Sequence, residues 1–184
     1  MNSNPWTTLS SAVQYDNPWI RVTEHAVIHP SGRQGIYGTV HYKNQAVGVA
    51  PYEAGWVWMV GQYRYPLARF SWEIPEGGSP FGEDVLATAQ RELAEETGLV
   101  AGKYEKLLEI HLSNSVSDEW GIVYLATELT QGHAHPEDTE TLKVEKWRLE
   151  TVYEAIESGE ITDSLTVAAI YKMMLLKSLG QLPA

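Results

Sequence analysis

Three glutamates near the middle of the chain, Glu92, Glu95 and Glu96, have the residue type and spacing of ligands for a divalent cation. Residues 83–97 around them contain good helix formers and no glycine or proline, and Gly98 follows directly. A glycine in this place is typical of the residue that ends a helix in the left-handed conformation. The sequence therefore predicts a helix that carries all three carboxylates near its C-terminal end.

The predicted helix places two of these carboxylates on the face that should pack on a sheet. At about 100° per residue, Val85 and Ala89 form an apolar row, and Glu92 and Glu96 continue it. Like charges four residues apart repel, carboxylates oppose the helix dipole at this end, and partial burial adds a desolvation cost. A bound Mg²⁺ or Mn²⁺ would offset these costs, since hard cations take oxygen ligands. A solvated acidic helix end is the alternative that the helix alone leaves open.

The residues before the helix narrow this choice. Residues 72–78 indicate a strand that runs into a glycine turn, whose backbone can come close to a metal or a phosphate. Together with the helix, this segment resembles the signature of the Nudix hydrolase family at every defined position. The matching positions are Gly77, Glu83, Arg91, Glu92, Leu93, Glu95, Glu96, Gly98 and Leu99.

The resemblance implies a set of metal ligands. By similarity to the family, Glu92 and Glu96 are the main ligands of Mg²⁺ or Mn²⁺, and Glu95 bridges to the metal or reaches it through water. The backbone carbonyl of Glu76, just before the glycine of the signature, is a further expected ligand.

The reaction that the resemblance implies is hydrolysis of a nucleoside diphosphate linked to another group. Bound cations neutralise the pyrophosphate, and a water activated by a carboxylate attacks one phosphorus. Arg91 is expected to orient the metal-binding carboxylates, with Glu83 beside them. A catalytic base is expected from the loop before the last strand, with Glu140 as the first candidate and Glu137 and Asp138 as the others. An ordinary flexible acidic loop is the alternative for this segment.

The segments on either side of the signature resemble the branch of the family that acts on ADP-ribose and nucleoside diphosphate sugars. Two of their residues, Arg64 and Glu73, are expected to bind substrate. The guanidinium of Arg64 could fork onto two phosphate oxygens, and a surface arginine is the alternative. Two departures from the branch, Asn114 in place of a proline and Leu165 in place of a lysine, weaken an assignment to ADP-ribose alone.

The nucleobase in this branch often stacks on aromatic residues of the N-terminal strands, sometimes across a dimer. Trp19 and Tyr37 are the candidate platforms here, and stacking contributes about 1–3 kcal/mol per base. Packing in the core is the alternative for both residues. We expect a homodimer, with residues 1–50 as N-terminal strands that could form a dimerisation arm and residues 51–184 as the catalytic domain.

The elements that must hold the helix follow from the pattern along the chain. Short β-forming segments separated by glycine and proline fill the first third, and strands and helices interleave afterwards, which predicts an α/β fold with a mixed sheet. Beyond the first helix we expect strands over 104–111, 121–126 and 142–149, and helices over 151–158 and 164–179. The resemblance implies a Nudix-type α/β/α sandwich with N-terminal antiparallel strands.

The composition limits the possible partners. With 24 acidic and 13 basic residues the net charge is −11, which argues against nucleic acid and acidic membranes as partners. The chain has no cysteine, which excludes disulfides and thiol nucleophiles. No apolar stretch approaches the roughly 20 residues of a membrane helix, and the first residues lack the pattern of a secretory signal. We therefore expect a cytoplasmic protein that acts on a small molecule.

The sequence leads to one hypothesis and two alternatives. We expect a Mg²⁺-dependent pyrophosphatase that cleaves ADP-ribose or a related nucleoside diphosphate sugar into a nucleoside monophosphate and a sugar phosphate. The first alternative is a Nudix pyrophosphohydrolase that acts on nucleoside triphosphates or RNA ends. The second is a domain that senses ADP-ribose-like ligands without cleaving them. Such domains commonly lack a signature carboxylate, whereas all are present here.

Overall fold

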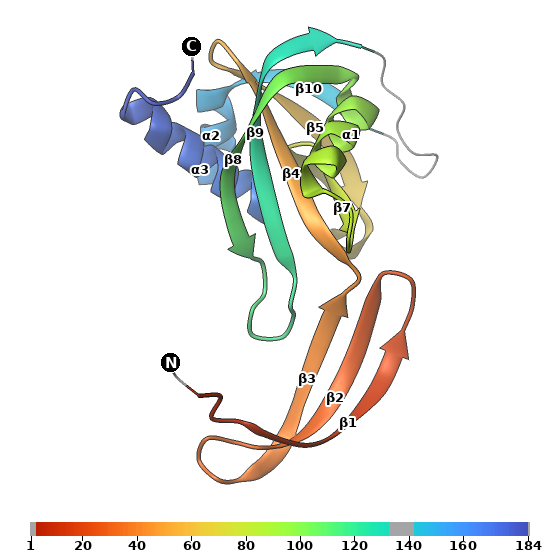
Figure 1. Ribbon diagram of the computed structural model, residues 1–184. Helices are drawn as coiled ribbons and strands as arrows, with labels where there is room; N and C mark the ends of the chain where they lie inside the picture. Colours follow the sequence, from red (N-terminus) through yellow and green to blue (C-terminus); the bar gives the residue numbers. More distant parts are fainter. Residues whose placement is uncertain (1–2, 133–141, 184) are drawn as a thin grey trace.

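The computed structural model describes residues 3–132 and 142–183. Figure 1 shows a small three-stranded sheet at the N-terminus and, joined to it by the chain, a larger sheet with helices on both faces. The predicted α/β/α sandwich with a mixed sheet and N-terminal antiparallel strands is confirmed.

The N-terminal sheet consists of three antiparallel strands in sequence order. They are β1 (Thr7–Asp16), β2 (Ile20–Ile28) and β3 (Gln34–Tyr42). All ten residues of β1 are exposed, and most of β2 and β3 is only partly buried. The sheet therefore has no helix packed on either face and contributes little to the buried core.

The larger sheet has the central order β10-β5-β4-β9-β8, with β6 paired to β5 and β7 paired to β4. The β4 and β9 strands run parallel and the other pairs are antiparallel. The bounds are β4 (Asn44–Glu53), β5 (Trp56–Arg64), β6 (Arg69–Glu73), β7 (Glu76–Pro80), β8 (Leu99–His111), β9 (Trp120–Gln131) and β10 (Lys143–Arg148), with a 3₁₀ turn at Tyr65–Leu67.

Three helices cover the two faces of this sheet. The first, α1 (Val85–Thr97), packs on one face, and α2 (Leu149–Glu157) and α3 (Ser164–Ser178) pack on the other (Figure 1). Alternation along β4 serves both layers, because Val47 and Val49 belong to the core under α1 while Ala50 and Tyr52 belong to the core under α2 and α3.

The ends of α1 have clear local causes. The helix begins two residues later than the sequence predicts, because Asp84 is its N-cap and its carboxylate accepts a hydrogen bond from Leu86 N at 3.0 Å. The predicted end is confirmed, with Gly98 in the left-handed conformation at φ 71°.

The predicted glycine turn before the helix is instead the short strand β7. Gly77 pairs with Val47 and Gly78 with Ala46 across an antiparallel ladder with β4. A Cβ atom on Gly77 would clash with Glu92 of α1, and one on Gly78 would lie 2.9 Å from Asn44 Nδ2, so glycine suits both positions.

The sheets change between Tyr42 and Asn44, a few residues before the expected boundary at residue 50. The division into a dimerisation arm and a catalytic domain stays a prediction. Within residues 3–132 and 142–183, no helix is long and apolar enough to cross a membrane, and the cytoplasmic location stays a prediction as well.

Candidate active site

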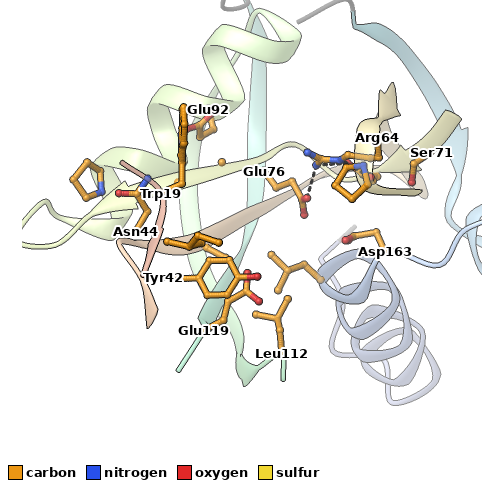
Figure 2. Close-up of a pocket in the computed structure, with 18 of the residues that line it drawn as sticks. Trp19, Tyr42, Asn44, Arg64, Ser71, Glu76, Glu92, Leu112, Glu119 and Asp163 are labelled. Carbon is orange, nitrogen blue, oxygen red and sulfur yellow. Dashed lines mark hydrogen bonds and ion pairs between the residues drawn. The ribbon is translucent and has the colours of Figure 1, made fainter. Parts of the chain in front are cut away.

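A cavity of about 1080 Å³ opens between β7, α1, the N-terminal sheet and the start of α3. Its centre is formed by the glycine strand and by the acidic side of α1. One end carries Trp19, Tyr42 and Glu119, and the other carries Arg64 and Asp163 (Figure 2). The cavity thus joins most of the predicted site residues to several that the sequence did not single out.

Of the two glutamates that continue the apolar row of α1, Glu92 lines the cavity, and Glu96 lies one turn further along the helix, behind the lining residues. Glu92 and Glu96 are both buried, with exposed fractions of 9% and 3%. The backbone N–H of Glu76 donates to Glu96 Oε2 at 3.1 Å. A Cβ atom on Gly77 would lie 2.1 Å from Glu92 Oε1, so only glycine lets β7 approach this carboxylate. The strand and the helix therefore hold both carboxylates in fixed positions.

Arg91 connects two of the carboxylates of α1. Its Nη1 atom lies 2.8 Å from Glu92 Oε1 and 2.9 Å from Glu95 Oε2. Its Nη2 atom donates to the carbonyl of Gly78 at 3.4 Å. The Glu83 side chain lines the cavity nearby. Arg91 therefore links Glu92, Glu95 and the glycine strand. Its single positive charge does not neutralise all three glutamates of α1.

The guanidinium of Arg64 lies in the cavity wall and is already paired with carboxylates. Its Nε atom donates to both carboxylate oxygens of Glu73 at 2.9 Å, and its Nη2 atom donates to Glu76 Oε1 at 2.7 Å (Figure 2). Burial alone would lower the pKa of Arg64, but these partners raise it. Arg64 thus organises the acidic wall, and any phosphate would have to share it with Glu73 and Glu76.

A second acidic group, which the sequence did not predict as a unit, lies beside Arg64. One carboxylate oxygen from each of Glu73, Glu76 and Asp163 lies within 4.8 Å of the other two. Burial, together with the charges of Asp163 and Glu73, raises the pKa of the Glu76 carboxyl well above its usual range, although Arg64 acts in the opposite direction. Within the described part of the chain, Glu76 Oε2 is buried and makes no hydrogen bond. This end of the cavity is therefore rich in hydrogen-bond acceptors.

The aromatic end of the cavity contains one of the two predicted stacking residues. Trp19 lines the cavity and is 67% exposed. Tyr37 lies elsewhere, in the wall of a smaller cavity of about 350 Å³, where its hydroxyl donates to the carbonyl of Ser115 at 2.5 Å. Tyr42 and Glu119 complete this end of the main cavity. The junction of β3 with β4 brings Tyr42 there, and the start of β9 brings Glu119.

The predicted base candidates Glu137, Asp138 and Glu140 lie outside the described residues. Their role stays a prediction.

Comparisons with known proteins agree with this architecture. The profile of the NUDIX domain matches residues 43–166, and the profile of the nucleoside diphosphate sugar hydrolase N-terminal domain matches residues 6–40. The match to the nucleoside diphosphate sugar hydrolase profile corresponds to most of the three-stranded sheet. The match to the NUDIX profile corresponds to the larger sheet, α1, α2 and the start of α3.

Two relatives and one solved structure extend over most of the chain. An ADP-ribose pyrophosphatase of Bacillus subtilis (strain 168) is 34% identical over 152 residues, 82% of each chain. One of Mycobacterium tuberculosis is 29% identical over 174 residues, 92% of this chain and 84% of the relative. The crystal structure of an ADP compounds hydrolase shares the fold, with a TM-score of 0.87 at 19% identity, over 99% of this chain and 100% of that one. The chain therefore belongs to the Nudix family and is a hydrolase similar to ADP-ribose pyrophosphatases.

Proposed function

We propose that the protein cleaves the diphosphate bond of ADP-ribose or a related nucleoside diphosphate sugar, with Mg²⁺ or Mn²⁺, and releases a nucleoside monophosphate and a sugar phosphate. The observation that carries this proposal is the layout of the cavity. Glu92 and Glu95 of α1 line it, together with aromatic side chains at one end and a group of carboxylates beside Arg64 at the other. The relatives named as ADP-ribose pyrophosphatases support the same substrate class.

The residues at the centre fit a divalent cation. Glu92 and Glu96 offer hard oxygen ligands from one face of one helix, and both are buried. Burial of two neighbouring carboxylates costs free energy unless positive charge compensates it. Arg91 supplies part of this charge, through contacts with Glu92 and Glu95. A divalent cation bound by Glu92 and Glu96 would supply the rest.

Each residue at the centre has a proposed task. Glu92 and Glu96 would hold the cations, and Glu95 and the backbone carbonyl of Glu76 would be the further ligands. Bound cations supply neutralisation of the diphosphate charge and polarisation of the phosphorus atom under attack. Arg91 keeps the carboxylates of Glu92 and Glu95 oriented before substrate arrives, which reduces the reorganisation needed during the reaction.

The two ends of the cavity suit the two ends of a nucleotide sugar. Trp19 and Tyr42 offer ring surfaces on which a nucleobase could stack. The carboxylates of Glu73, Glu76 and Asp163 offer acceptors for the hydroxyl groups of a sugar, and Arg64 holds Glu73 and Glu76 in place. The diphosphate between base and sugar would then lie over the glutamates of α1.

A carboxylate from residues 133–141 is the proposed general base. Glu140 is the first candidate and would take a proton from the attacking water, with Glu137 and Asp138 as the other candidates. Replacement of Glu140 with Gln tests this assignment, since retained turnover would place the base elsewhere.

A homodimer formed through the N-terminal sheet is the proposed assembly. This sheet exposes large apolar side chains, with Leu9 52%, Val13 57% and Ile36 69% exposed. Val13 and Ile36 point to opposite faces of the sheet, and exposed apolar side chains on a sheet that no helix of the described chain covers suit an interaction surface. A second copy of the chain could cover it.

A substrate panel tests the proposed activity. The protein would be incubated with Mg²⁺ and ADP-ribose, GDP-mannose, dGTP or capped RNA, and the products would be identified by chromatography. We expect cleavage of the sugar-linked diphosphates into a nucleoside monophosphate and a sugar phosphate. Preference for dGTP or capped RNA would favour a pyrophosphohydrolase that acts on nucleoside triphosphates or RNA ends. Binding of ADP-ribose without turnover would favour a sensing domain.

A further inference from the structure

Glu119 stands at the aromatic end of the cavity, away from the glutamates of α1. Its side chain lines the cavity beside Tyr42, as Figure 2 shows, and it is partly buried. Within the described residues, its carboxylate makes no hydrogen bond, whereas its backbone carbonyl accepts one and its backbone N–H donates one. Glu119 therefore presents two acceptor oxygens where the proposed function places the nucleobase.

The backbone around Glu119 is held by two neighbouring segments. The carbonyl of Glu119 accepts from Leu112 N at 3.3 Å, which closes the loop between β8 and β9. The preceding residue, Asp118, accepts from Tyr42 N at 3.1 Å and pairs with His41 Nδ1 at 2.5 Å. These contacts connect the loop to the end of β3. They hold the backbone of Glu119 beside that of Tyr42, and both side chains line the same cavity.

The surroundings of Glu119 are less polar than solvent. Burial raises the pKa of the Glu119 carboxyl above its usual value. Burial and the charge of Glu119 together raise the pKa of the Tyr42 hydroxyl, so the two groups interact. In such a setting, a donor that satisfies the carboxylate contributes more to binding than it would in water.

Among the nucleobases, guanine matches a carboxylate at this place best. Its N1–H and N2–H₂ groups are adjacent donors, which two carboxylate oxygens can accept together. Hypoxanthine retains the N1–H donor only. Adenine presents the lone pair of N1 there, which the carboxylate repels. A site built to pair such donors discriminates against bases that lack them.

On the basis of the proposed function, we propose that Glu119 is a specificity-determining residue that accepts hydrogen bonds from N1–H and N2–H₂ of guanine. The base stacks beside Tyr42 and Trp19, and the preferred substrates are guanosine diphosphate sugars. The ribose of the same nucleotide is the other group that could bind this carboxylate, and the experiment separates the two.

The test compares three substrates that differ only in their base. The ratio kcat/KM would be measured for GDP-mannose, IDP-mannose and ADP-mannose at pH 8, with the wild type and the Glu119→Gln variant. The matched control is Glu109→Gln, which removes an exposed carboxylate that pairs with Lys106 outside the cavity. Thermal melting would verify that each variant folds.

We expect the wild type to prefer GDP-mannose, then IDP-mannose, then ADP-mannose. The Glu119→Gln variant should lower the preference for GDP-mannose over ADP-mannose by about 10- to 100-fold, the usual effect of losing hydrogen bonds to a charged group. The control should keep the wild-type preference. An unchanged preference in Glu119→Gln would overturn the proposal, and so would an equal loss on all three substrates, which would assign the carboxylate to the ribose.

Failure of the proposed function would give a different result. If none of the three substrates is cleaved, the hydrolase proposal fails, whereas the assignment of Glu119 is still decided by binding. Tryptophan fluorescence would then measure the affinity for GMP, IMP and AMP. The assignment holds if the wild type binds GMP most tightly and Glu119→Gln loses that preference, and it fails if the variant keeps the wild-type order.

Discussion

At the scale of single residues, the site depends on close contacts that small changes would disturb. Gly77 and Glu92 give the clearest case, because the glycine strand lies against the carboxylate with no space for a side chain. The sequence predicted Glu92, Glu95, Glu96 and Arg91 as a group, since all four lie within one helix. Whether they act as predicted is a question for mutagenesis.

Replacement of Gly77 with Ala should displace the Glu92 carboxylate. The added Cβ would lie 2.1 Å from Glu92 Oε1, so the carboxylate or the strand must move. A displacement of about 1 Å at a catalytic group typically costs about 100-fold in rate, and we expect a fall in kcat of this size. Gly38→Ala is the control, because a Cβ there meets no atom within 4 Å. Equal activity of the two variants would contradict this expectation.

Glu119 should make stability depend on pH in a defined direction. Burial raises the pKa of the Glu119 carboxyl in the folded protein above the ordinary 4.5. The contribution of the protonated carboxyl to folding stability is therefore present below pH 4.5 and is lost as the pH rises through the raised pKa. The Glu119→Gln side chain does not ionise. The melting temperature of the variant minus that of the wild type should therefore be more positive at pH 8 than at pH 4. A difference that is the same at both values would argue against burial of the charge.

At the scale of elements, the helix that carries the glutamates was the most predictable part of the structure. Its residues combine good helix propensity with the cap residues Asp84 and Gly98, so local signals alone define it. The strand β1 lies within the N-terminal strands expected for residues 1–50, but no bounds were predicted for it, and all of its residues are exposed. The strand β7 was predicted as a turn, because its glycines gain their extended conformation from pairing with β4.

The cavity residues that the sequence missed share one property. Tyr42, Glu119 and Asp163 come from three separate segments that meet only in the folded chain. The parallel pairing of β4 with β9 brings Ala46 beside Gly121, and this register places the ends of both strands at the cavity. Pairings between distant strands leave no periodic signal in a single sequence, so these residues could not be grouped in advance.

The N-cap of α1 should contribute measurably to stability. The Asp84 carboxylate accepts a hydrogen bond from Leu86 N, and Asp84→Ala removes it. We expect the free energy of unfolding in urea to fall by about 0.5–2 kcal/mol. Asp84→Ser should retain most of the stability, since serine also caps helices. If alanine and serine gave the same loss, the cap would not be the cause.

At the scale of the whole molecule, the N-terminal sheet stands apart from the two buried cores. Its strands expose apolar side chains on a surface that no helix of the described chain covers. At the same time, its end supplies Trp19 and Tyr42 to the cavity. The sheet thus connects the proposed assembly to the proposed substrate site.

A charge on the exposed sheet should disrupt the proposed dimer. Val13 is 57% exposed on β1, and we expect Val13→Asp to shift the protein from dimer to monomer in sedimentation velocity. Leu179→Asp is the control, because Leu179 is 59% exposed after α3, at the opposite end of the chain. A wild type that sediments as a monomer, or a dimer that Val13→Asp leaves intact, would rule out this interface.

Whether the carboxylates of α1 bind Mn²⁺ decides the proposed metal site. Electron paramagnetic resonance of free Mn²⁺, titrated with protein, measures the affinity without any substrate. We expect the wild type to bind Mn²⁺ and the Glu96→Gln variant to lose at least about tenfold in affinity, with the fold retained. Equal affinity in the two proteins, or no binding by the wild type, would contradict the claim that Glu92 and Glu96 are buried together because they share divalent cations.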